Sequence, residues 1–223
     1  MLEELYGVPT APEADPLALL VMTILSQNTT DVNSLKAYRS LKSAYPDYED
    51  ILSSSQEDLA RLIRIGGLGE IKAKRMIEAL HRIKQDSGSL DLSFLGGLSK
   101  EAAMDYLLSL PGVGRKTASV VLLFGFGFPF MPVDTHVRRV SQRLGLVAKG
   151  ASFEKTQEIL ERAVPSEKYP SLHLNLISHG RRICHARKPL CESCRLRTIC
   201  DYYLGAQGLN ERKARPPFRA PVV

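Results

Sequence analysis

The residues of this chain best suited to chemistry are four cysteines that lie close together near its C-terminus. They follow the pattern C-x6-C-x2-C-x5-C, and the chain contains no other cysteine. Thiolates at this spacing are typical ligands of an iron–sulfur cluster or of a zinc ion. Structural zinc sites usually use two separate C-x2-C pairs, whereas here one pair and two lone cysteines share one short segment. We therefore expect a [4Fe–4S] cluster, with zinc as the alternative, held by Cys184, Cys191, Cys194 and Cys200.

Two disulfides are a further possible use of four cysteines. The sequence shows no signal peptide, so we expect a cytoplasmic protein whose thiols stay reduced. The longest apolar stretch, residues 17–25, is too short to span a bilayer, so we expect no membrane partner. The net charge of +6 favours a polyanionic partner, while an aromatic content of only 7% argues against domains that bind nucleic acids by base stacking.

A second candidate site is the segment 110–121 (LPGVGRKTASVV), in which two glycines closely precede an Arg-Lys pair. The glycines allow a sharp turn that points N–H groups outward, and the N-terminus of the next helix attracts anions. We expect Gly112, Gly114 and Arg115 to bind a DNA phosphate as a helix–hairpin–helix motif does, without reading sequence. A nucleotide-binding P-loop needs a preceding strand and a glycine directly before the lysine, where this chain has Arg115. An ordinary interhelical turn is the remaining alternative.

Two further residues near this hairpin have side chains suited to catalysis. Lys116 begins the helix after the turn, and a neutral lysine is a nucleophile. The positive charge of Arg115 favours the neutral amine, bound phosphates favour the charged one, and a simple phosphate contact is the alternative role. Asp134 is expected to be the N-cap of a helix, which leaves one carboxylate oxygen for chemistry. A carboxylate beside a neutral amine is the pair that breaks a glycosidic bond.

The elements that must position these groups all have the periodicity of helices. Apolar residues recur at helical spacing, and no alternating strand pattern of convincing length is present. The fold class is therefore predicted to be all-α, with a buried first helix and Asp31 as the N-cap of the second. The predicted helices span residues 17–25, 31–45, 57–65, 71–83, 100–110, 115–124, 134–144, 153–164 and 169–183.

The hairpin, the segment 133–136 and the cysteine loop, in this order and spacing, resemble the endonuclease III family. This family is the iron–sulfur branch of the helix–hairpin–helix DNA glycosylases. The similarity runs from about Pro16 to Tyr203 and includes the segments 24–31, 65–68 and 179–181. It implies a monomer with a six-helix barrel domain at 15–125, a cluster domain formed by 1–14 and 126–203, and a basic tail at 204–223.

The resemblance also implies an activity in base excision repair, in the cytoplasm and close to the nucleoid. DNA would lie across the cleft between the domains, with Lys116 and Asp134 facing each other there. Lys116 would displace a damaged base by attacking C1′ of its sugar, form a Schiff base and nick the strand by β-elimination, with Asp134 assisting. The partner implied is double-stranded DNA that carries oxidised pyrimidines or abasic sites, because poorly stacked bases flip out easily.

Five residues are expected from the resemblance to contact DNA outside the hairpin. In the family a glutamine fills the gap left by the flipped nucleotide, and this chain has Asn28 at that place with Gln27 beside it. Leu68 matches an apolar wedge that kinks the duplex, with packing against the barrel as its alternative role. Arg187 and Lys188 in the cysteine loop would lie near phosphates.

Two other functions remain open from the sequence. A monofunctional glycosylase for mismatched thymine or adenine would need Asp134 but no lysine nucleophile, so Lys116 argues against it. A non-enzymatic iron–sulfur module for DNA binding or redox sensing would need only the basic charge and the cysteines.

Overall fold

The computed structural model describes residues 1–9 and 15–208 of the chain. Every regular element in this part is a helix, and no strand is found in it, which confirms the predicted all-α fold class. The contacts divide the chain into two compact units, one of which is the continuous segment Pro12–Phe128. The other combines Met1–Ala11 with Pro129–Val223. None of the described helices has the length and the hydropathy that crossing a membrane requires.

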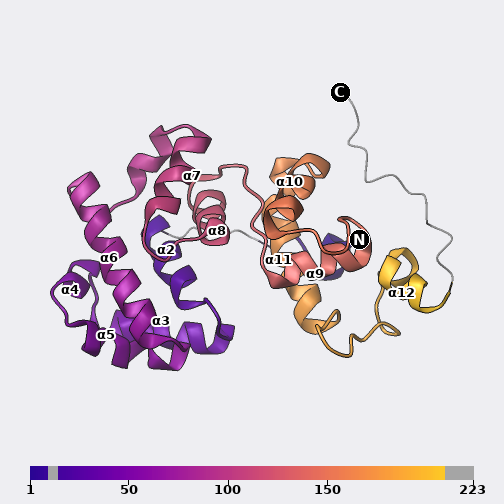
Figure 1. Ribbon diagram of the computed structural model, residues 1–223, viewed down its shortest axis with the longest axis horizontal. Coiled ribbons are helices and arrows are strands. Elements are labelled where there is room, and N and C mark those ends of the chain that lie inside the picture. The colour runs from indigo at the N-terminus through magenta and orange to yellow at the C-terminus, as the bar shows by residue number, and fades with distance from the viewer. Residues whose placement is uncertain (10–14, 209–223) are drawn as a thin grey trace. The chain divides into compact units, whose positions relative to one another are not determined.

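The continuous unit is a bundle of helices around α2 (Pro16–Leu25), which packs most closely against α8 (Arg115–Phe126) (Figure 1). Most of α2 is buried, as predicted, and Met22 is its exposed exception. The remaining α-helices of this unit are α3 (Asp31–Ala44), α4 (Tyr48–Leu52), α5 (Gln56–Ile63), α6 (Gly69–Ser87) and α7 (Lys100–Ser109). Two short 3₁₀ helices, η1 (Arg64–Gly66) and η2 (Ser93–Gly97), lie between them.

Side-chain caps explain where several of these helices begin. The Asp15 carboxylate accepts a hydrogen bond from the Ala18 N–H at the start of α2. At the start of α3 the cap is Thr30, whose hydroxyl accepts from the Asn33 N–H, so the prediction of Asp31 as the cap was wrong by one residue. Asp31 instead lies in the first turn, where its negative charge interacts favourably with the helix dipole.

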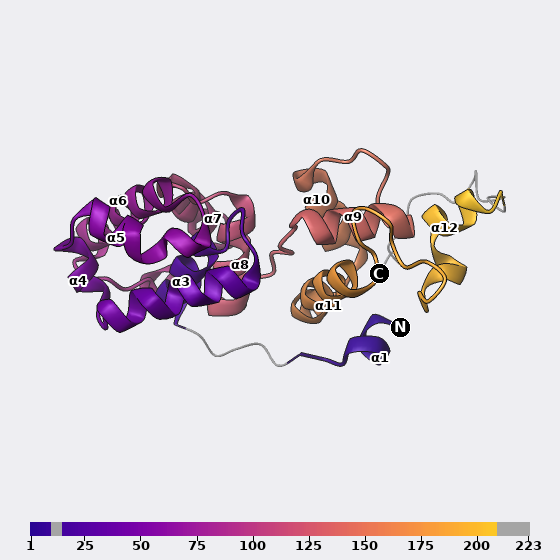
Figure 2. The ribbon, with the colours of Figure 1, turned by 90° about the horizontal axis from the view of Figure 1, so that it is seen from below.

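The discontinuous unit is built on the pair α9 (Thr135–Leu144) and α11 (Tyr169–Arg182). Gly180 permits their close crossing, since a Cβ atom there would lie 2.8 Å from Nδ1 of His136. Figure 2 shows α1 (Leu2–Tyr6) beside α11. The other elements of this unit are α10 (Phe153–Ala163), α12 (Asp201–Ala206), and the 3₁₀ helices η3 (Ser166–Lys168) and η4 (Arg197–Ile199).

Polar contacts fasten the N-terminal residues to the C-terminal part of this unit. The Glu3 carboxylate accepts a hydrogen bond from the Ser171 hydroxyl at 2.6 Å and pairs with Lys168 at 3.0 Å. The Tyr6 hydroxyl lies 2.9 Å from Nδ1 of His179. The predicted basic tail begins within α12, and its residues 209–223 lie outside the described part of the chain.

Candidate active site, DNA-binding loops and metal centre

The turn between α7 and α8 has the geometry of an anion-binding hairpin. Gly112 has a φ of +78°, and a Cβ atom at this position would lie 2.6 Å from Cδ of Arg75. Gly114 is the N-cap of α8 and provides no capping side chain. The first N–H groups of a helix have no partner within the helix, and the positive end of the helix dipole attracts anions such as a phosphate.

Lys116 lies in the first turn of α8 and is partly buried. The next residues of the helix, from Thr117 to Leu123, are all buried, and they anchor it in the bundle. The hairpin and this buried helix therefore fix the backbone from which the Lys116 side chain extends.

Asp134 is the N-cap of α9, as predicted from the sequence. Its Oδ1 atom accepts a hydrogen bond from the Val137 N–H at 2.7 Å. In the part of the chain that the structure describes, no hydrogen bond is found to the second carboxylate oxygen, Oδ2. Asp134 thus uses one of its two carboxylate oxygens for the cap. Lys116 belongs to the other compact unit, so the predicted encounter of the two side chains stays a prediction.

Three residues predicted to contact DNA have an unusual backbone conformation. Asn28, Leu68 and Lys188 have φ angles of 51°, 53° and 49°, and they are the only non-glycine residues with positive φ in residues 1–9 and 15–208. This conformation costs about 1–2 kcal/mol for most L-residues such as Leu68 and Lys188, and less for asparagine, which adopts it more readily. Such strain persists where the surroundings enforce it, and it is concentrated at functional sites. Leu68 is 50% exposed, although its side chain is apolar.

Gln27 is held by the hairpin. Its Nε2 atom donates a hydrogen bond to the carbonyl oxygen of Gly112 at 3.0 Å and lies 3.5 Å from Oγ1 of Thr117. This contact connects the loop after α2 with the turn before α8. Of the two residues considered for the gap of a flipped nucleotide, Gln27 is therefore engaged within the protein, whereas Asn28 has the strained backbone.

The four cysteines line one small hollow, which is partly open to solvent and has a cavity volume of about 20 Å³. Burial raises the pKa of Cys191, Cys194 and Cys200, and the neighbouring thiols raise it further. Binding of a metal group must therefore displace protons from these thiols. Within the described ranges no three His, Cys, Asp or Glu side chains converge on the position of a single ion. Four thiols that line one hollow are the soft ligands that an iron–sulfur cluster or a zinc ion takes.

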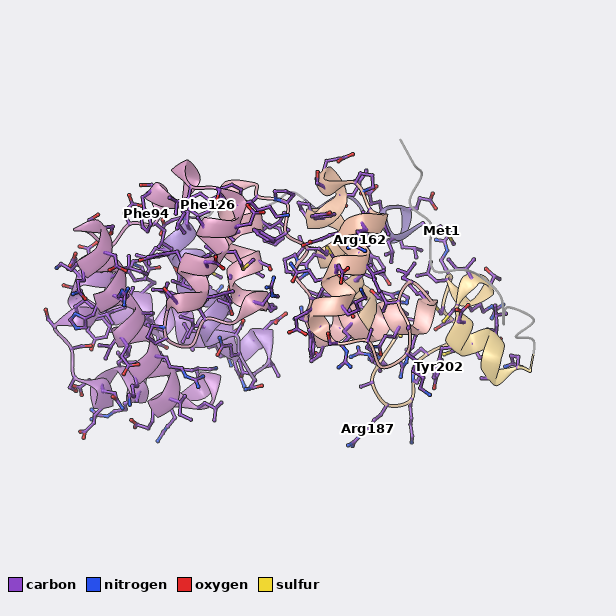
Figure 3. The ribbon with its side chains drawn as sticks, turned by 45° about the horizontal axis from the view of Figure 1, so that its top comes forward. Met1, Phe94, Phe126, Arg162, Arg187 and Tyr202 are labelled. Carbon is purple, nitrogen blue, oxygen red and sulfur yellow. The ribbon has the colours of Figure 1, made fainter. Side chains whose placement is uncertain are left out.

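Basic and polar side chains hold the cysteine loop in place. Arg143 donates hydrogen bonds to Sγ of Cys184 at 3.3 Å and to the carbonyl oxygen of His185 at 2.6 Å. Its guanidinium group also lies over the ring of Tyr202. Figure 3 shows Arg187 at the tip of this loop, with its side chain extending away from the ribbon. Arg187 and Lys188 are both exposed, so the structure presents two cations on an anchored loop.

Two basic features of the structure were not predicted from the sequence. The first is a set of four cations along an open groove between α3 and the α5–η1 segment, where the sequence has two pairs of cations spaced three residues apart. The second is the buried residue Lys72, which no local sequence pattern indicates. The cations of the groove are Lys36, Arg39, Arg61 and Arg64.

Comparisons with known proteins agree with this architecture. The family model described as HhH-GPD superfamily base excision DNA repair protein matches residues 21–166. Endonuclease III of Thermotoga maritima is 39% identical over 191 residues, which cover 86% of this chain and 85% of that protein. Endonuclease III of Rickettsia conorii is 42% identical over 187 residues, 83% of each chain.

A solved structure gives the same result. It is described as a trapped endonuclease III–DNA covalent intermediate, and it superposes with a TM-score of 0.79 at 31% identity over 92% of this chain and 93% of that one. The fold and the sequence are therefore similar over nearly the whole chain, which confirms the family resemblance. The chain belongs to the endonuclease III family within the HhH-GPD superfamily, and it is a DNA glycosylase of base excision repair.

Proposed function

We propose that this glycosylase is bifunctional: it removes oxidised pyrimidines from duplex DNA as a monomer and then nicks the abasic site. The observation that carries this proposal is the position of Lys116 directly after the hairpin turn. A phosphate bound by the N–H groups of the turn and of α8 holds the sugar–phosphate chain beside this amine. The relative described as a trapped covalent intermediate with DNA supports an enzyme–DNA bond in this family.

The proposed reaction proceeds through a covalent bond to the sugar. The neutral amine of Lys116 attacks C1′, and the bond to the base breaks with its electron pair leaving on the base, which takes up a proton. The amine loses a proton and the sugar ring opens to a Schiff base. Removal of a C2′ proton then expels the 3′ phosphate, which nicks the strand, and water releases the enzyme. Asp134 stabilises the positive charge on the sugar during displacement and transfers protons.

The strained loops are proposed to open the duplex. Asn28 occupies the gap left by the flipped nucleotide, because Gln27 is bound to the hairpin. Leu68 enters between base steps as an apolar wedge. Its 50% exposure and its left-handed backbone conformation support this role. Gly112, Gly114 and Arg115 bind phosphate at the hairpin, and Arg187 and Lys188 contact the backbone from the cysteine loop.

We expect Gly112→Ala to weaken both folding and DNA binding. The added methyl group meets Arg75 at 2.6 Å, and the positive φ is unfavourable for alanine, so the free energy of unfolding should fall by about 2–4 kcal/mol. The control is Gly88→Ala, which has a φ of +79° but no atom within 4 Å of the new Cβ. Chemical denaturation should show a clearly smaller loss for the control, and its affinity for duplex DNA should be unchanged. Equal losses in the two variants would contradict the close contact.

The four cysteines are proposed to hold a [4Fe–4S] cluster with a structural role, because the cluster would fasten the loop that carries Arg187. We expect purified protein to absorb visible light and to contain iron and sulfide in equal amounts. Cys194→Ser should lose most of the iron and bind DNA more weakly, whereas Ser193→Ala, next to it, should retain both. Bound zinc without visible absorption would establish the alternative.

The experiment that tests the proposed function measures base release and strand nicking separately. Duplexes containing thymine glycol, a mismatched thymine or a mismatched adenine are incubated with the protein under single-turnover conditions. We expect release and nicking together on thymine glycol, and an adduct after borohydride reduction. Release from a mismatch without nicking would instead establish the monofunctional alternative.

A further inference from the structure

In the described part of the continuous unit, Lys72 is the one charged residue that is buried, and the catalytic scheme does not use it. It lies in the first turn of α6 and is only 2% exposed. No other lysine or arginine, and no carboxylate, is buried in the described part of the chain. Burial lowers the pKa of Lys72, which reflects the cost of removing an ammonium group from water. A group this costly to bury requires a reason.

The amine of Lys72 joins the ends of two helices. Its Nζ atom donates to the carbonyl oxygen of Leu25 at 2.7 Å and to that of Gly66 at 2.8 Å. Leu25 is the last residue of α2, and Gly66 is the last residue of η1. Carbonyl groups at helix C-termini have no partner within the helix and carry partial negative charge, so a cation between them satisfies both.

The two helices are followed at once by the two strained loops. Asn28 lies three residues after Leu25, and Leu68 lies two residues after Gly66. The loops are also neighbours in space, since a Cβ atom on Gly67 would lie 3.9 Å from the carbonyl oxygen of Asn28. One buried amine is therefore bonded to the backbone at the start of both loops.

We propose that Lys72 is a positioning residue that holds the Asn28 loop and the Leu68 loop in one fixed arrangement for joint entry into the duplex. This inference rests on the proposed function of the two loops. With the amine present, each loop meets the DNA already ordered in its left-handed conformation. Without it, two buried carbonyl groups lose their partner, and the loops must be ordered during base opening.

The test compares Lys72→Met, which keeps the apolar stem and removes the donors, with the wild-type protein on two substrates. The first is a thymine glycol duplex, in which a base pair must be opened. The second is a single-stranded oligonucleotide with an abasic site, in which no base has to leave a stack. We expect excision from the duplex to slow by roughly ten- to a hundredfold, because misplaced groups cost rates of this order. Nicking of the single strand should stay within about twofold of wild type on the same grounds.

A local measurement separates positioning from general destabilisation. The fluorescence of 2-aminopurine placed beside the lesion reports base opening, and its rise should be slowed by Lys72→Met to the same extent as excision. The control is Lys74→Met on the same helix, where the side chain is 63% exposed, and it should behave as wild type. Equal loss on both substrates, or no loss on the duplex, would overturn the inference.

A second variant keeps the inference testable if Lys72→Met does not fold. Lys72→Arg retains a charged donor of different shape, so we expect it to fold and to show the same selective loss on the duplex in weaker form. An unchanged ratio of the two activities in this variant, with normal 2-aminopurine kinetics, would contradict positioning. The proposed function fails in a different way, because the wild-type protein would then lack one or both activities.

Discussion

Replacing Lys116 with glutamine is expected to abolish the covalent adduct and the strand nick. The amide has no nucleophilic nitrogen, so C1′ cannot form a Schiff base with it. Base release should also fall, by roughly 10³-fold or more. Without the amine, water must displace the base, and water is the weaker nucleophile. Borohydride trapping on thymine glycol duplex, with base release measured in parallel, checks both expectations.

Arg115→Gln is the matched control, because it removes the neighbouring exposed cation of the same helix turn. It should weaken DNA binding and make it less sensitive to salt, since one phosphate contact is lost, while the adduct still forms at saturating protein. An adduct that persists in Lys116→Gln would assign the nucleophile to another amine. Base release at the wild-type rate without nicking in that variant would show that the lysine serves only the lyase step.

The local features of the fold were predictable because they depend on neighbours in the sequence. The helix predicted over 100–110 is found as α7 (Lys100–Ser109), and the one over 169–183 as α11 (Tyr169–Arg182). The cap at Asp134 was predictable because a carboxylate before a helical pattern has a bonding partner three residues away. The short helices α1, α4 and α12 were missed, since one or two turns show no periodicity.

Features of the site that depend on distant residues could not be predicted in this way. The hydrogen bond of Gln27 to Gly112 joins residues 85 positions apart, and it is the reason why we propose Asn28 for the gap of the flipped nucleotide. The bond of Lys72 to Leu25 spans 47 positions, and the sequence around Lys72 resembles that of any exposed helix. Both contacts join a side chain to a distant backbone carbonyl group that only the folded bundle brings near, so no local sequence pattern predicts them.

Asp134→Asn is expected to separate the two roles of this residue. Asparagine caps helices as well as aspartate does, so its side-chain oxygen should keep the bond to the Val137 N–H and the unfolding temperature should hardly change. The neutral amide cannot balance positive charge on the sugar or accept a proton, so base excision should slow by roughly 10²–10⁴-fold. Differential scanning calorimetry and single-turnover excision measure the two effects independently.

The comparison with Asp134→Ala completes this argument. Alanine removes the cap as well as the charge, so this variant should lose about 1 kcal/mol of stability in addition to the loss of excision. Affinity for duplex DNA should survive in the asparagine variant, since it leaves the phosphate-binding cations in place. If Asp134→Asn excises thymine glycol at the wild-type rate, the carboxylate is only a cap. The positive charge that develops on the sugar would then have to be stabilised by another group of the enzyme.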